Sequence, residues 1–282
     1  MSNSHSNLLM QKPAAELSMG RALAHRAAQH LTAFARANIE AKPDDSHSNL
    51  GWDAQLNAFS THPIGGAMAV LQLSPLTLLM FDGAEAVDKL ALAGKSVADV
   101  EAWIDQAALA LGLNAPSSAA IPYDLPDDVT AIGQYDVDGA ASELAALSDW
   151  FGLANSVLGE LERSASEHKP GPSPVRCWPH HFDIATYISF EEGDPETARG
   201  MGVGMSPGDE GHDQPYFYIN PWPHLDPDTL PDAVAPGFWH VEGYVGLVAT
   251  GTALQETGFV AGSTVDFINY GFKTAYGAQW PS

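Results

Sequence analysis

Apolar side chains recur three or four positions apart in several parts of the chain, which is the spacing of one face of an α-helix. The pattern predicts helices over 14–41, 96–112, 140–165 and 264–276. The second of these opens with a capping pair, because Asp99 follows Ser96 by three residues. Gly112 is expected to end it.

Shorter apolar runs bounded by Pro, Gly and Asp predict strands. In the first half of the chain, 66–81 predicts two strands broken at Ser74-Pro75. In the second half, the pattern predicts strands over 175–190, 202–206, 216–220 and 238–248. The turns between these strands are rich in Gly, Pro and Asp, which favours an antiparallel meander. The predicted fold class is therefore α+β, with antiparallel sheet and flanking helices.

The order of these elements predicts one domain with two lobes. We expect 1–13 to be a disordered leader and 14–282 to be a single α+β domain, divisible into lobes 14–165 and 174–282. The two lobes would be pseudo-symmetric units of strands followed by a helix, because 93–97 (AGKSV) and 261–265 (AGSTV) are alike. The long loop 114–139 is either a linker or a segment pinned by the side chains Ile121, Tyr123 and Tyr135.

The net charge of the chain indicates which classes of binding partner are favoured. The 282 residues contain 12 Lys and Arg against 35 Asp and Glu, a formal net charge of -23. Such a polyanion is repelled by phosphate backbones and anionic lipids, so nucleic acid and membrane surfaces are poor partners. A cationic partner or a bound metal stays open. The single cysteine, Cys177, excludes an intrachain disulfide, and neither an apolar run of about 18 residues or more nor a signal-peptide pattern appears. We therefore expect a cytoplasmic protein.

The stretch between Ser173 and Pro223 is the densest in Trp, Pro, His and Tyr. It contains Ser173-Pro174-Val175 leading to Trp178, then Phe182-Asp183-Ile184-Ala185, a Ser-Pro-Gly-Asp turn at 206–209, and Pro221-Trp222-Pro223. In these motifs, and over roughly 95–250, the chain resembles the DUF5996 family, bacterial proteins that have no assigned activity. The resemblance implies kinship and names no reaction.

Four polar side chains in predicted strands suggest a site. In a strand, alternate residues share a face, so His181 and Asp183 would share one, as would His240 and Glu242. If the two strands are neighbours, all four side chains converge. Two imidazoles and two carboxylates are suitable ligands for Zn, Mn or Fe, and without a metal they can transfer protons. The alternative is that these histidines are structural, because register is unknown and one residue of slip separates the set.

Aromatic residues beside this set suggest ligand binding. Tyr216, Tyr218 and Trp222 could stack on a flat ligand, and Asp209 lies in a loop over 206–213 that could cover a pocket. The ordinary alternatives are core aromatics and a surface turn. The leading hypothesis is a small-molecule-binding protein or metal-assisted enzyme with its pocket beside 175–190. The rival hypothesis is a non-enzymatic homo-oligomer or partner-binding protein that uses the aromatic second half as its interface.

Overall fold

The computed structural model describes residues 12–194 and 196–280, so the predicted leader over 1–13 falls almost wholly outside the described residues. The chain forms two compact units. The N-terminal unit comprises 17–148 and 176–182, and the C-terminal unit comprises, of the described residues, 12–16, 149–175 and 183–280 without 195. The division between the units thus falls inside a helix, between Ser148 and Asp149, whereas the predicted lobes are 14–165 and 174–282.

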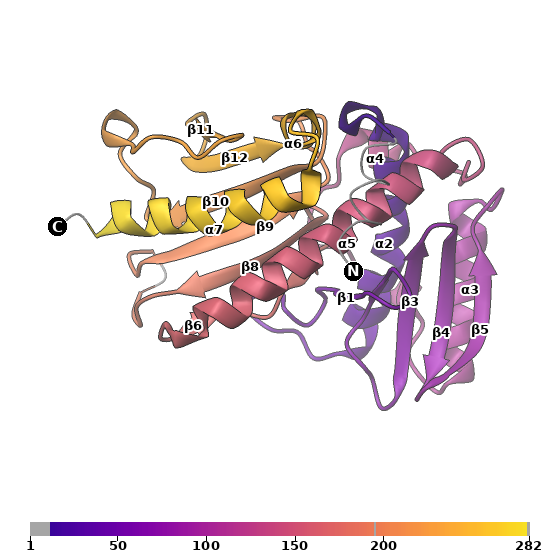
Figure 1. Cartoon of the computed structure of the whole chain (residues 1–282). Helices are drawn as coiled ribbons and strands as arrows, with labels where there is room; N and C mark the ends of the chain where they lie inside the picture. The colour runs from indigo at the N-terminus through magenta and orange to yellow at the C-terminus, as the bar shows by residue number, and fades with distance from the viewer. Residues whose placement is uncertain (1–11, 195, 281–282) are drawn as a thin grey trace. The chain divides into compact units, whose positions relative to one another are not determined.

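The N-terminal unit contains an antiparallel sheet in which sequence neighbours are also spatial neighbours (Figure 1). Its strands in order are β1 (Gly51–Asp53), β2 (Ala58–Ser60), β3 (Ala67–Leu73), β4 (Leu76–Asp82) and β5 (Glu85–Ala91). Cross-strand pairs on one face are completely buried, such as Ala69 with Met80 and Leu71 with Leu78. This alternation is the pattern of a sheet with one face against a core.

Helices cover the buried face of this sheet. They are α2 (Ser18–Asn38), which packs on β3, and α3 (Val97–Ala110), which contacts β5; the short helix α4 (Asp127–Thr130) packs on α2, and a 3-10 turn lies at Pro116–Ser118. Leu31 and Phe34 of α2 are fully buried. The helix α3 begins at a complete capping box, in which Ser96 accepts from the backbone of Asp99 and Asp99 accepts from the backbone of Ser96. A third short strand segment, β7 (Arg176–Trp178), also belongs to this unit, and Cys177 pairs with Leu50.

The C-terminal unit contains a second antiparallel sheet with a more complex order. Along the sheet the strands run β11 (Phe238–His240), β12 (Gly246–Thr250), β10 (Tyr216–Trp222), β9 (Gly200–Ser206), β8 (Asp183–Ser189) and β6 (Gly171–Pro172). Three short 3-10 turns complete this unit, at Ala14–Glu16, Ala165–Glu167 and Pro227–Thr229.

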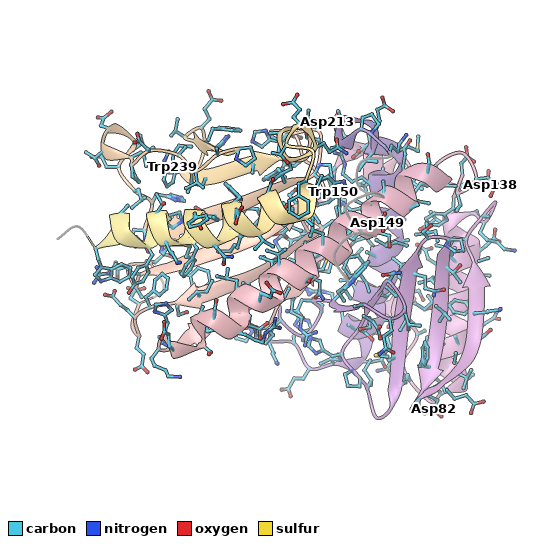
Figure 2. All side chains as sticks on the ribbon, in the orientation of Figure 1. Asp82, Asp138, Asp149, Trp150, Asp213 and Trp239 are labelled. Carbon is cyan, nitrogen blue, oxygen red and sulfur yellow. The ribbon has the colours of Figure 1, made fainter. Side chains whose placement is uncertain are left out.

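Two long helices pack on one face of the second sheet, which we call the inner face (Figure 1). The helix α7 (Val260–Gln279) packs on β10 and β12, where Gly271 allows close approach because an added Cβ would lie 2.6 Å from the Cδ1 of Ile219. The second part of α5 (Ala141–Ser164) brings Trp150, labelled in Figure 2, within 6.4 Å of the ring of Phe217. The short helix α6 (Gly251–Glu256) follows β12.

The α+β class with antiparallel sheets and flanking helices is confirmed. Both strands predicted over 66–81 form, broken at Ser74-Pro75, and the long loop 114–139 is pinned where Tyr135 is fully buried. The two similar segments behind the proposed pseudo-symmetry differ in structure, because 93–97 is a turn leading into α3 and 261–265 lies inside α7. No helix within the described residues has both the length and the apolar composition to cross a bilayer.

Candidate functional site

The sheet of the C-terminal unit has two faces of different chemistry. Strand register places the fully buried Ile188, Met201 and Phe217 on the inner face. The opposite, outer face carries small, polar and aromatic residues. In strand order these are Asp183, Ala185, Tyr187 and Ser189 of β8, Gly200, Gly202, Gly204 and Ser206 of β9, and Tyr216, Tyr218, Asn220 and Trp222 of β10.

Glycines on β9 give this outer face its shape, because two tyrosine rings lie directly on the strand. A Cβ added at Gly204 would lie 2.5 Å from the hydroxyl oxygen of Tyr218 and 2.8 Å from the Cβ of Ala185. A Cβ added at Gly200 would overlap the ring of Tyr187. Glycine is therefore required at both positions by the rings that cross them.

Between these two rings the strand is bare. At Gly202 an added Cβ would meet nothing closer than 3.9 Å, where the Cβ and carbonyl oxygen of Asn220 lie. The Oδ1 atom of Asn220 is buried and has no hydrogen-bond partner among the described residues. A buried unpaired acceptor is costly, and such atoms in native proteins call for an explanation such as a bound water or ligand.

A pocket of about 770 Å³ lies on this outer face beside β8. Its walls include the rings of Tyr187 and Trp222. The loop after β8 and the start of β9 supply the remaining lining, which comprises Pro170, Ser189, Glu191, Glu192, Gly193, Glu196, Ala198 and Arg199. The volume falls within the range of roughly 300–1,000 Å³ that is usual for small-molecule sites.

Arg199 is already engaged at the edge of this pocket. Its guanidinium donates to the carboxylate of Glu191, with Nε 2.8 Å from Oε1, and stacks on the ring of Trp280 at 4.2 Å. This pairing lowers the pKa of Glu191, mainly through the side-chain hydrogen bond. Arg199 also borders a smaller pocket of about 290 Å³, which Pro223, His224 and Gln279 help to line.

Two tyrosine–carboxylate pairs lie on the outer face of the sheet. The hydroxyl of Tyr218 donates to Asp183 at 2.5 Å, and the hydroxyl of Tyr216 donates to Asp209 at 2.5 Å. Burial and the neighbouring carboxylates raise the pKa of both tyrosines well above the ordinary value. Both phenols therefore stay protonated at neutral pH and act as hydrogen-bond donors, which rules them out as bases or nucleophiles.

An aromatic group surrounds the Asp209 loop. The ring of His212 lies 4.9 Å from that of Tyr216 and 5.5 Å from that of His240. Burial is the main cause that lowers the pKa of His212. Asp209 accepts from the backbone nitrogens of Gly211 and His212 as well as from Tyr216, so its carboxylate organises the loop over 206–213. His240 lies 4.4 Å from Tyr244, ring to ring.

The predicted convergence of His181, Asp183, His240 and Glu242 is wrong. The strands β9, β10 and β12 separate β8 from β11, so Asp183 and His240 lie on strands about 19 Å apart at the usual 4.8 Å spacing. Glu242 is exposed, and its backbone oxygen accepts from His240 Nε2 at 2.6 Å. No group of three or more His, Cys, Asp or Glu within 12–194 and 196–280 is arranged to hold a metal ion.

His181 belongs to a turn that interrupts the strand predicted over 175–190. The backbone nitrogen of Phe182 donates to the oxygen of Trp178 at 2.7 Å, and Phe182 has a positive φ of 59°. The ring of Phe182 is fully buried and stacks on His25 at 5.0 Å. His181 itself is exposed, with its ring 4.2 Å from that of His180.

This turn is held by α2. His25 Nε2 lies 2.8 Å from the oxygen of Pro179, and Gln29 Nε2 donates to the same oxygen at 2.9 Å. Two side chains on one carbonyl give the Trp-Pro-His-His-Phe motif a structural role in the N-terminal unit.

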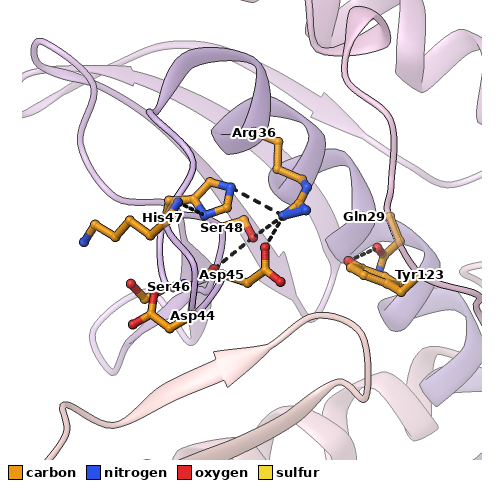
Figure 3. Close-up of polar contacts among 9 residues, drawn as sticks. Gln29, Arg36, Asp44, Asp45, Ser46, His47, Ser48 and Tyr123 are labelled. Atoms are coloured by element: carbon orange, nitrogen blue, oxygen red, sulfur yellow. Dashed lines mark hydrogen bonds and ion pairs between the residues drawn. The ribbon is translucent and has the colours of Figure 1, made fainter.

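A second polar cluster in the N-terminal unit is also structural (Figure 3). The Nη1 atom of Arg36, near the end of α2, donates to Asp45 at 2.9 Å and to Ser48 at 3.2 Å. His47, which is buried, accepts the backbone N–H of Lys42 at 3.2 Å. These contacts tie the loop after α2 to the helix, and nearby Tyr123 donates to Gln29 at 2.8 Å.

The structure thus places the predicted site residues in separate groups. Asp183, Asp209, Tyr216 and Tyr218 form hydrogen-bonded pairs on the outer face, and Trp222 lines the pocket at its other end. The sequence analysis missed the role of the β9 glycines. The signal was present, because glycine at every second position of 200–205 (GMGVGM) predicts one bare strand face.

Comparison of the chain with known proteins finds no matching family model, no matching curated protein and no matching solved structure.

Proposed function

We propose that this chain binds a small molecule in the pocket beside β8. The observation that carries the proposal is the pocket of about 770 Å³ on the outer face, walled by Tyr187 and Trp222. Exposed aromatic rings at the rim of a hollow are suited to stack on flat ligands. Tyr187 is 39% exposed, so part of its ring is accessible at the pocket.

The features of β9 support the same proposal. Gly202 leaves β9 bare between the rings of Tyr187 and Tyr218, which cross Gly200 and Gly204. The buried, unpaired Oδ1 of Asn220 adds an acceptor in the same row of the sheet as Tyr187 and Gly202. A mostly apolar hollow with a few placed polar groups is the usual form of a small-molecule site.

The test is ligand-observed NMR with a library of flat aromatic and sugar fragments. We expect some fragments to bind the native chain, and Tyr187→Leu to reduce their binding by about tenfold, the equivalent of ~1.4 kcal/mol of stacking and contact energy. The matched control is Tyr270→Leu, which removes a tyrosine that is 57% exposed on α7 and does not line the pocket. Equal binding by the two variants, or no fragment bound by the native chain, would refute the proposal.

A reaction is a separate question from binding. With the predicted metal set separated, and both buried tyrosines held protonated, the outer face supports binding more directly than catalysis. Kinship with the DUF5996 family stays a proposal, supported by the motifs between Ser173 and Pro223, and it adds no activity.

The second candidate function is self-association through the aromatic-rich C-terminal half. The observation that favours it is the edge strand β11, where Phe238 is 43% exposed and Val241, just beyond it, is 48% exposed. Edge strands with exposed apolar side chains are suited to pair with a second copy. Light scattering of the native chain and of Val241→Lys tests this, and a monomer in both cases would exclude it.

A further inference from the structure

We propose that the ligand of the pocket beside β8 is a small organic cation, a quaternary ammonium or a protonated amine. The inference rests on the proposed function and names its ligand class. The cation would lie against the rings of Tyr187 and Trp222, with the carboxylates of Glu192 and Glu196 facing it from the loop after β8.

The aromatic walls supply the first part of the argument. Trp and Tyr are the rings that attract cations most strongly, because their faces carry partial negative charge. Both rings belong to the rigid part of the pocket, since Tyr187 lies in β8 and Trp222 ends β10. The ring of Tyr187 is supported from below by the backbone at Gly200, so its position is fixed by the sheet.

The charges of the lining supply the second part. Glu191 and Arg199 pair with each other, and Arg199 also lies on Trp280. Among the described residues that line the pocket, the remaining charged ones are Glu192 and Glu196, and none is a further Lys, Arg or His. An anionic ligand would find no free positive charge here, whereas a cation would meet two carboxylates.

The charge of the whole chain acts in the same direction. A formal net charge of -23 concentrates cations near the surface and repels phosphates and carboxylates. Because this attraction is screened by salt over about 8 Å at physiological ionic strength, binding is expected to weaken as salt rises.

The experiment compares two molecules of nearly equal shape, choline and its neutral analogue 3,3-dimethylbutan-1-ol. Each carries one sharp methyl signal, so saturation-transfer NMR gives both dissociation constants on the same full-length protein. We expect choline to bind at least about tenfold more tightly, which corresponds to ~1.4 kcal/mol. Raising the salt concentration should weaken choline binding and leave the neutral analogue unchanged.

Variants identify the groups responsible. The double variant Glu192→Gln, Glu196→Gln removes two carboxylate charges from the pocket lining and should weaken choline binding several-fold without affecting the neutral analogue. The matched control is Glu256→Gln, an exposed acid on α6 that does not line the pocket. Trp222→Leu should weaken choline binding and Tyr270→Leu should not.

The outcomes separate this inference from the proposed function. If the neutral analogue binds as tightly as choline, or if the double variant binds choline like the native chain, the cation is overturned and a neutral ligand remains. Suppose that neither choline nor its analogue binds, while neutral fragments still bind to the native chain and lose affinity in Tyr187→Leu. The assignment of a cationic ligand is then also overturned. If nothing binds in a manner dependent on Tyr187, the proposed function itself fails.

Discussion

Acid should unfold the N-terminal unit through two buried histidines of α2. His25 is 4% exposed and His30 is 5% exposed. Burial is the main cause that lowers the pKa of His25 to about 4 and that of His30 to about 3. His25 lies against the oxygen of Pro179 and stacks on Phe182, and His30 lies at the hydroxyl of Tyr135, 2.9 Å away.

The direction of the effect follows from which state binds the proton. Above pH 6.5 both histidines are neutral in the folded and the unfolded chain, so the free energy of unfolding is at its full value. Below pH 6.5 the unfolded chain takes up protons that the folded chain rejects until the pH reaches about 4 at His25 and about 3 at His30. Stability is therefore lost progressively as the pH falls from 6.5 to these values.

The magnitude can be worked out for one pH. From the two pKa values and an unfolded value of about 6.5, linkage gives a loss of about 2 kcal/mol for each histidine between pH 7.5 and pH 5, hence about 4 kcal/mol for the pair. A loss of this size is a large part of the ~5–15 kcal/mol by which domains are usually stable.

Hydrogen exchange of α2 amides, followed by mass spectrometry and corrected for intrinsic rates, measures this loss in the N-terminal unit. His25→Gln and His30→Gln cannot titrate, so each should shrink the difference between pH 7.5 and pH 5 by about 2 kcal/mol, even though each also loses a contact. His224→Gln, at an exposed histidine of the C-terminal unit, should leave the difference unchanged. A native difference below about 1 kcal/mol, or one insensitive to both variants, would refute the reasoning.

Three further substitutions test packing and capping, each by urea unfolding. Gly204→Ala should cost about 1–3 kcal/mol, because the new methyl displaces the ring of Tyr218; an unchanged midpoint would contradict the close approach. Ser96→Ala should cost about 1 kcal/mol by removing the cap of α3, and no loss would mean that the cap adds nothing. Phe34→Ala should cost about 3–5 kcal/mol because the ring is fully buried, whereas Leu109→Ala, at a side chain 59% exposed, should cost little; equal costs would count against the described core.

Local signals predicted the parts of the fold that are fixed by neighbouring residues. The break at Ser74-Pro75 between β3 and β4, and the capping box at Ser96, depend on residues a few positions apart. The strand β5 could not be predicted in this way, because nearly all its side chains are exposed and the alternation of apolar and polar residues is missing. The strands β1 and β2 are too short for a period to appear.

In the candidate site, too, local features could be predicted from the sequence and non-local features could not. Tyr216, Tyr218 and Trp222 share one face of β10, although the strand predicted over 216–220 ends before Trp222. Strand order is a non-local property, and no pattern in the sequence shows that β9, β10 and β12 lie between Asp183 and His240. Nor does alternation reveal the turn before Asp183, which depends on the contact of Pro179 with His25.

The path of the chain between the two units has a consequence for synthesis. The N-terminal unit receives its last segment, 176–182, after the chain has already entered the C-terminal unit at 149. That segment supplies Cys177, the partner of Leu50, and the buried ring of Phe182. A nascent chain cannot finish its first unit until Phe182 has left the ribosome, so a product stopped near 148 would expose the apolar surface that this segment normally covers.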